Sequence, residues 1–263
     1  MKNNRKTKSW INLMAFILTL GINTLGSIGI INGMNQKAVS DKYHTLITPA
    51  PFTFSIWGLI YTLVFISLIA MIIKHKDRGY QRLIDIFTPP FLLSAIFNIL
   101  WILIFSYEKI GISTIFIFGL LLSLTTLNKK LWENRREIPD QLTAITFGLY
   151  AGWLTIATVV NISAFLVSIN WNGFGIAPTI WAPLTLAIAL IIVLFIAFKL
   201  QNVAYTLPVA WAFFGILKES QSSGSTTDYG AFMKPVLIIG MIVLIVAALY
   251  QFKKNNFSVL PKE

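Results

Sequence analysis

Long apolar runs separated by short charged segments dominate this chain. A hydrocarbon core about 30 Å thick needs about 20 apolar residues in a helix, because no water is present there to satisfy an open backbone. Eight runs approach this requirement, and they predict an all-α fold, a polytopic membrane helix bundle. The predicted spans lie near residues 10–32, 53–73, 87–106, 111–128, 142–168, 178–198, 203–217 and 235–252.

The seventh run, 203–217, is the shortest and carries Pro208 near its middle. It is compatible with a re-entrant or kinked helix as well as with a complete crossing. The distribution of Lys and Arg favours the crossing. With eight spans, 16 of the 21 basic residues lie at the two termini and in the loops on the same side, and positive charge gathers on the cytoplasmic side. We therefore expect both termini in the cytoplasm.

Composition supports a membrane protein and excludes several other classes. Hydrophobic residues make up 56% of the chain and charged residues only 12%, about half the usual share of a soluble domain. This excludes an ordinary soluble enzyme and a disordered chain. No cysteine is present, so disulfides and thiolate metal sites are excluded too. The net charge of +11 sits in the loops, so we expect the lipid bilayer and not nucleic acid as the partner. Low Arg with high Lys, Ile and Asn usage favours a bacterial plasma membrane.

Ionisable groups avoid the predicted spans. Transporters driven by ions or protons keep such groups inside the bilayer despite their cost, so a proton-driven carrier is disfavoured. No Ser/His/Asp set and no metal-ligand cluster stands out either, so we expect no enzyme activity and no cofactor. The acidic residues and histidines in loops or at span ends are Asp41, Asp77, Asp85, Glu108, Glu133, Glu137, Asp140, Glu219, Asp228, Glu263, His44 and His75.

Three of the predicted spans carry aromatic side chains at helical spacing. Residues three, four or seven apart share one helix face. An amide on that face would be unpaired against lipid, so the amides should turn these faces inward. Such stripes are more often core packing than a ligand cage, and both interpretations remain open here. The residues are Trp57 and Tyr61 in the second span, Asn98, Trp101 and Phe105 in the third, and Tyr150, Trp153 and Asn161 in the fifth.

These stripes resemble the TspO/MBR family, the tryptophan-rich sensory proteins related to the translocator protein or peripheral benzodiazepine receptor. The resemblance rests on the segment 49–61, on Asn98-Ile-Leu-Trp101 followed by Phe105, and on Tyr150-Ala-Gly-Trp153 followed by Asn161. They look like the second, third and fifth helices of the family. The resemblance implies a five-helix region over 1–168 and an additional three-helix membrane extension over 169–263.

The family's ligands are porphyrins and other tetrapyrroles, with sterols and synthetic aromatic compounds in some members. The resemblance therefore implies a sensor or carrier whose pocket lies beneath the first loop, here 33–52. The eight stripe residues are carried over as its ligand-binding residues. Two departures stand out: Phe52 and Phe54 occupy positions where many members have tryptophan, and the five-helix family lacks the last three spans.

Two other functions and one assembly state stay open at this stage. The added spans could build a path for a small hydrophobic solute, which is the activity of a transporter or permease component. Light-driven breakdown of a bound porphyrin is a further alternative, although the sequence offers no acid, base or metal for a dark reaction. Finally, Gly29 with Gly33 and Gly148 with Gly152 have the spacing of close helix packing, inside the monomer or in a homodimer.

Overall fold

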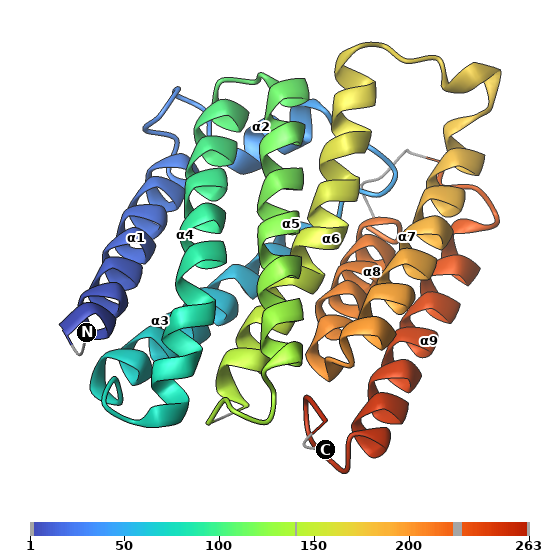
Figure 1. Cartoon of the computed structure of the whole chain (residues 1–263). Coiled ribbons are helices and arrows are strands. Elements are labelled where there is room, and N and C mark those ends of the chain that lie inside the picture. The colour runs from blue at the N-terminus through green and yellow to red at the C-terminus, as the bar shows by residue number, and fades with distance from the viewer. Residues whose placement is uncertain (1–2, 140, 223–227, 262–263) are drawn as a thin grey trace.

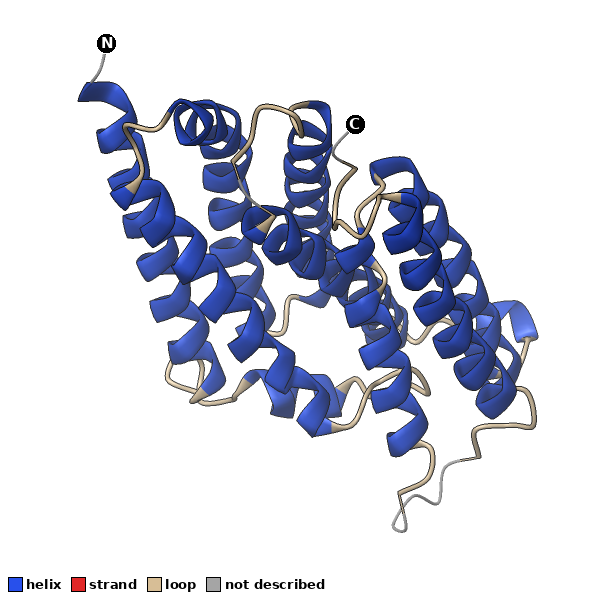
Figure 2. Ribbon diagram, turned by 90° about the horizontal axis from the view of Figure 1, so that it is seen from below, coloured by secondary structure: helices blue, strands red, loops and turns tan. Residues whose placement is uncertain are grey.

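The computed structural model describes residues 3–139, 141–222 and 228–261, and this part of the chain consists of helices and loops without a strand (Figure 1, Figure 2). The α-helices are α1 (Asn3–Ser27), α2 (Gln36–Lys42), α3 (Ile56–Ile73), α4 (Arg78–Ser106), α5 (Ile110–Glu133), α6 (Leu142–Ser168), α7 (Pro178–Leu200), α8 (Leu207–Glu219) and α9 (Met233–Lys254). Short 3-10 helices occur at η1 (Pro51–Ser55), η2 (Gly173–Gly175) and η3 (Val203–Tyr205).

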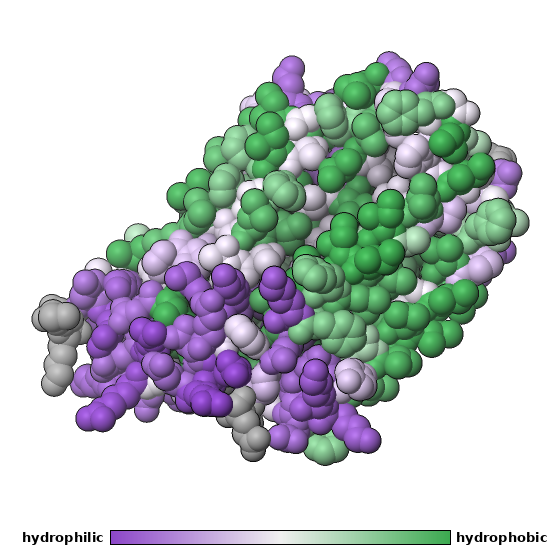
Figure 3. All heavy atoms as spheres, turned by 45° about the vertical axis from the view of Figure 1, so that its right-hand side comes forward, coloured by the Kyte–Doolittle hydropathy of each residue, from purple (hydrophilic) through white to green (hydrophobic). Residues whose placement is uncertain are grey.

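Seven helical segments in the described residues are long and apolar enough to cross a membrane: α1, η1 with α3, α4, α5, α6, α7 and α9. Hydrophilic residues gather at the lower end of the molecule, and hydrophobic residues cover the flank above them (Figure 3). A flank of exposed apolar side chains is what a lipid-facing surface requires. The chain is thus an integral membrane protein with a helical bundle, and the predicted fold class is confirmed.

The seventh predicted span takes a different form from the one expected. In place of a helix over 203–217, the chain forms η3 and then α8, which has 13 residues and is about 20 Å long. Pro208 lies in the first turn of α8, where its missing N–H costs no hydrogen bond, so it does not kink a helix, which was one of the alternatives for this segment. Both chain ends nevertheless lie toward the lower end of the bundle, because η3 and α8 lead the chain back between α7 and α9 (Figure 1).

The third predicted span begins nine residues too late. Asp77 caps the helix by accepting hydrogen bonds from the N–H groups of Gly79 and Tyr80, at 2.9 and 3.2 Å, so α4 starts at Arg78. The first turns of α4 are polar, so the apolar run that predicted the third span did not include them. Because α4 starts this early, Pro89 and Pro90 lie inside the helix and not in its first turn.

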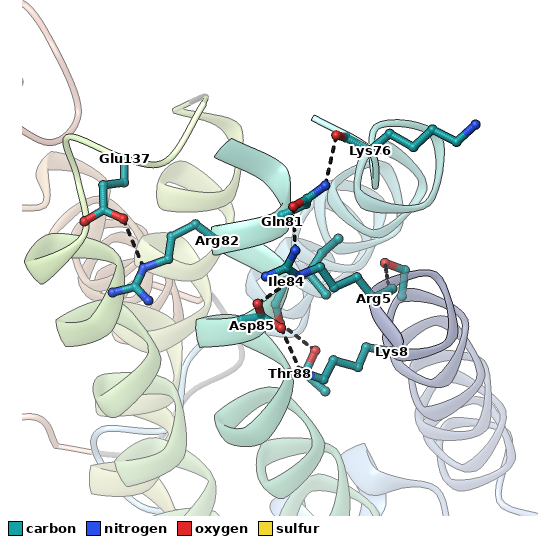
Figure 4. Close-up of polar contacts among 10 residues, drawn as sticks. Arg5, Lys8, Lys76, Gln81, Arg82, Ile84, Asp85, Thr88 and Glu137 are labelled. Atoms are coloured by element: carbon teal, nitrogen blue, oxygen red, sulfur yellow. Dashed lines mark hydrogen bonds and ion pairs between the residues drawn. The ribbon is translucent and has the colours of Figure 1, made fainter. Parts of the chain in front are cut away.

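The early start of α4 also places Asp85 inside a helix, in an ion cluster at the lower end (Figure 4). Its carboxylate contacts Arg5 Nε at 2.9 Å and Lys8 Nζ at 2.7 Å, both from α1. The amide of Asn12 on α1 donates to Thr88 Oγ1 at 3.0 Å one turn further along α4. These contacts hold α1 against α4 where the helices leave the apolar layer.

The two predicted glycine pairs behave differently. Gly29 and Gly33 lie beyond the end of α1 with φ of 79° and 71°, so they form a left-handed turn and not a packing stripe. Gly148 and Gly152 lie on the face of α6 that packs against η3 and α8, where a Cβ would meet Asn202 and Tyr205. The second pair therefore serves packing within the chain.

Candidate ligand-binding site

The predicted aromatic stripes converge on one ring cluster in the upper half of the bundle. Trp57 on α3 lies at its centre. Its ring centroid is 5.2 Å from that of Tyr61, 6.3 Å from Trp101, 5.8 Å from Tyr150 and 6.1 Å from Trp153. Residues from three helices far apart in sequence thus face one another, as the helical spacing and the polar members of the stripes indicated.

Beside this cluster lies a cavity of about 430 Å³. This volume is within the range of small-molecule pockets, which are mostly apolar and contain a few polar groups. The lining includes six of the eight predicted site residues, namely Trp57, Tyr61, Trp101, Phe105, Trp153 and Asn161. The other two, Asn98 and Tyr150, lie behind this wall.

Asn98 and Tyr150 belong to a hydrogen-bonded chain that supports the wall. The Asn98 amide donates to the Tyr150 hydroxyl at 2.9 Å, and Asn23 on α1 donates to Asn98 Oδ1 at 2.6 Å. The Tyr61 hydroxyl in turn donates to Asn23 Oδ1 at 3.0 Å. Asn98 is fully buried, and a buried amide of this kind is tolerated because its groups are paired. In this arrangement Asn98 positions the rings and does not face the cavity.

Asn161 positions a second ring. Its Oδ1 accepts a hydrogen bond from Trp101 Nε1 at 3.1 Å, and its amide donates to Thr114 Oγ1 on α5 at 2.7 Å. Trp153 differs, because its indole N–H is buried and has no hydrogen-bond partner among the described residues. The side chain is 2% exposed and lines the cavity. A buried donor without a partner is costly, so this N–H is suited to a ligand acceptor.

Sequence reasoning missed the parts of the lining that come from α1, α2 and α8. The α1 residues repeat at positions i, i+3, i+4 and i+7, so one helix face could have been found, but it holds a single amide and no aromatic ring. The α2 and α8 residues carry no comparable pattern. These additional lining residues are Leu20, Asn23, Thr24 and Ser27 of α1, Gln36, Lys37 and Ser40 of α2, and Ala212 and Ile216 of α8.

Helix α8 closes one side of the cavity and is fastened to the segment that leads into α3. The Ala50 N–H donates to the Gly215 carbonyl at 3.1 Å, and Trp211 Nε1 donates to the Thr53 carbonyl at 2.9 Å. The Phe52 ring packs edge-on against Trp211, with the two ring centroids 5.5 Å apart. The cavity therefore depends on the C-terminal region as well as on residues 1–168.

Helix α2 lies over the cavity and is tied down by Glu108, which follows α4. The Glu108 carboxylate is paired with the Lys42 ammonium and accepts a hydrogen bond from the Tyr43 hydroxyl at 3.1 Å. The hydrogen bond from Lys42 holds the pKa of the Glu108 carboxyl below its usual range and raises the pKa of Lys42. Burial, followed by the bond to Glu108, raises the pKa of the Tyr43 hydroxyl.

We expect Glu108→Gln to loosen α2 without unfolding the bundle. Exposed ion pairs contribute little, so amide hydrogen exchange over residues 36–43 should quicken by about two- to fivefold at pH 7. Folding lowers the pKa of Glu108, so the ion pair stabilises the docked α2 at pH values above the pKa that Glu108 has in the unfolded chain. This stabilisation is lost as the pH falls through the lower pKa that Glu108 has in the folded protein. After correction for the intrinsic pH dependence of exchange, the wild type should therefore approach the variant below about pH 4.

Glu133→Gln is the matched control, because Glu133 pairs with Lys129 within α5 and does not contact α2. Its exchange over residues 36–43 should equal that of the wild type. Unchanged exchange in Glu108→Gln would show that the ion pair does not hold α2 in place.

A comparison with protein families gives a match over most of the chain. The model of a family described as TSPO-like protein matches residues 9–250, which include α8 and most of α9. No curated protein and no solved structure matches the chain.

Proposed function

Because the chain belongs to the TSPO-like family, we propose that it is a membrane sensor or carrier that binds a porphyrin-like tetrapyrrole or another flat, apolar aromatic compound. The ligand occupies the cavity between α1, α3, α4, α6 and α8. The observation that carries this proposal is the presence of three indoles from three helices, Trp57, Trp101 and Trp153, in the lining of one cavity.

The chemistry of the lining supports a flat aromatic ligand with few polar groups. Aromatic rings pack well on other rings, edge-on or offset, and indoles offer large apolar faces for such contacts. The unpaired N–H of Trp153 can donate to a carbonyl, carboxylate or ring nitrogen of the ligand. The described lining contains no carboxylate and no imidazole that could act as a general acid or base. We accordingly propose binding without catalysis.

Binding is favoured over passage through the bundle because the cavity ends at a hydrogen-bonded floor. Asn23, Tyr61, Asn98 and Tyr150 connect α1, α3, α4 and α6 below it. Beneath this layer, a void of about 10 Å³ adjoins Tyr61 and Tyr150, which is about enough for one water molecule. A transporter of a hydrophobic solute, the alternative function, would have to open this layer.

The orientation of the protein in the membrane follows from its charges. Arg5, Lys8 and the basic loops lie at the lower end, and positive charge gathers on the cytoplasmic side. We propose that this end faces the cytoplasm across a bacterial plasma membrane. Helix α2 and the cavity then lie toward the outer leaflet.

The proposal is tested by titrating the full-length protein in lipid nanodiscs with protoporphyrin IX. Tryptophan fluorescence should be quenched saturably. A ligand of about 40 non-hydrogen atoms at about 0.3 kcal/mol per atom reaches about 12 kcal/mol at most, so the dissociation constant should lie between nanomolar and micromolar. Nanodiscs that contain tryptophan octyl ester in place of the protein give the nonspecific quench. Quenching of the protein that stays linear and matches these nanodiscs would contradict the proposal.

A further inference from the structure

The cavity lining is exposed only on particular elements, and this distribution indicates how a ligand enters. We infer that the cavity is loaded from inside the bilayer, through a lateral opening between the upper half of α1 and the segment formed by η1 and the start of α3. The inference rests on the proposed function, because it concerns entry into the same cavity. It adds the route, and therefore the class of ligand: a compound dissolved in the outer leaflet.

The exposed members of the lining come chiefly from two facing edges. They are Leu20, Thr24 and Ser27 of α1 and Pro51, Phe54 and Gly58 of η1 and α3; Lys37 of α2 is the one other exposed residue of the described lining. Leu20 is 39% exposed and Phe54 is 37% exposed. By contrast, every lining residue from α4, α6 and α8 is buried or half-buried. The walls formed by those helices are therefore closed, and the gap lies between α1 and α3.

The course of the two helices explains the gap. Their lower halves are in contact: Ser9 Oγ donates to the Met71 carbonyl at 3.4 Å at the lower end, and further up the Phe16 ring centroid lies 6.0 Å from that of Tyr61. Above that point α1 and α3 diverge (Figure 1). The bond between Tyr61 and Asn23 is the last hydrogen bond or ring contact that joins them among the described residues.

The opening faces acyl chains and not water. Leu20 lies seven residues before the end of α1, which is about 10 Å along the helix and inside the apolar layer. The outward faces at this height are apolar, with Ile17 56% exposed on α1 and Leu59 52% exposed on α3. The route from water is covered by α2, which is held by Glu108.

The polar groups near the opening define the ligand further. Gln36 of α2 lines the cavity, and its buried Nε2 has no hydrogen-bond partner among the described residues. Ser27, Ser40 and Lys37 line the same upper end. A compound that enters sideways would place its apolar body among the indoles and keep a hydrogen-bond acceptor beneath α2, at the level of the lipid head groups. The expected ligand is therefore a membrane-dissolved amphiphile with an acceptor at one end.

The chain contains no cysteine, so a single engineered thiol can report on the route. Ala157→Cys places it on α6 inside the cavity lining. The probes are hexadecylmaleimide, which stays in the membrane, and a sulfonated maleimide, which stays in water. Gly58→Trp, added to this background, would obstruct the opening, because a Cβ at Gly58 has open space around it. Gly21→Trp is the matched control: Gly21 is an equally open helical glycine that does not line the cavity.

We expect hexadecylmaleimide to label the engineered thiol of Ala157→Cys faster than the sulfonated reagent does. Gly58→Trp should slow the labelling by about tenfold or more, Gly58→Leu by an intermediate factor, and Gly21→Trp by less than about twofold. Gel filtration and thermal unfolding establish that each variant is folded. Labelling that is unaffected by both Gly58 substitutions, or that is faster from water, would overturn the lateral route. The assay needs no porphyrin, so failure of porphyrin to bind would overturn the proposed ligand and leave the route intact.

Discussion

Replacing Trp57, Trp101 and Trp153 together by phenylalanine is expected to weaken protoporphyrin binding by about 100-fold. Each substitution removes half of a bicyclic face, and an aromatic contact contributes about 0.5–1.5 kcal/mol beyond the area that it buries. Three losses of about 1 kcal/mol each correspond to about two orders of magnitude in the dissociation constant. The change at Trp153 also removes a buried N–H that has no acceptor among the described residues, so a ligand acceptor that reaches it would lose its partner.

The measurement must use the absorption band of the porphyrin, because the triple variant lacks the indoles that report binding by fluorescence. A second triple variant, in which Trp10, Trp171 and Trp181 become phenylalanine, is the control. It removes the same number of indoles from positions outside the cavity lining, and its affinity should stay within about twofold of the wild type. Equal affinities of the two triple variants would remove the assignment of the ring cluster as the binding site.

Helix spacing explains why most of the ring cluster was predictable. Trp57 and Tyr61, four residues apart, share a helix face in any α-helix, and the same holds for Trp101 and Phe105. The amides Asn98 and Asn161 indicated that those helix faces point into the bundle, because an unpaired amide is unfavourable against lipid. What spacing cannot give is depth within the bundle. Asn98 and its partner Tyr150 lie one layer behind the cavity because the tertiary contact with Asn23 pairs them there.

The C-terminal wall could not be predicted, because its residues are ordinary for an apolar helix. Ala212 and Ile216 line the cavity because Gly215 lies close to Thr53 and the Gly215 carbonyl accepts a hydrogen bond from the Ala50 N–H. These are contacts between segments more than 150 residues apart. The same limit applies to the start of α4, where the cap by Asp77 extends a helix beyond the apolar run that marked it.

The position of α8 gives a physical role to the region that follows residue 168. The rings of Phe52 and Phe214 are 5.9 Å apart, and the Trp211 and Phe214 rings 5.8 Å apart, so α8 continues the aromatic packing of the segment that enters α3. A helix too short to span the bilayer is stable there because α6 and α9 cover it, and Phe213 and Ile216 are fully buried. The cavity is thus a product of both regions, and its stability should depend on the contact between α6 and η3.

That contact leads to the second large effect: Gly152→Ala is expected to destabilise the protein by about 3 kcal/mol, at the upper end of the usual cost of overpacking. A Cβ at this position would collide with the Tyr205 carbonyl oxygen and would lie 2.8 Å from Pro208 Cγ. A backbone oxygen cannot rotate away, so α6 and η3 must separate. The 2.7 Å hydrogen bond between Thr155 and Tyr205 and the bonds from Asn202 to α5 and α6 would then be strained or lost.

Thermal unfolding in nanodiscs measures this effect, with an expected decrease of about 10 °C in the midpoint. Gly21→Ala is the matched control, because it adds the same methyl group to a helix at a site where nothing lies within 4 Å. It should leave the midpoint unchanged or raise it slightly, since alanine favours the helix. Porphyrin affinity should fall in Gly152→Ala and not in Gly21→Ala, because displacement of η3 moves Ala212 and Ile216 away from the cavity. The contrary result would be that both variants have the unfolding midpoint and the porphyrin affinity of the wild type. In that case α8 could not be packed on α6 as described, and the cavity would lose its C-terminal wall.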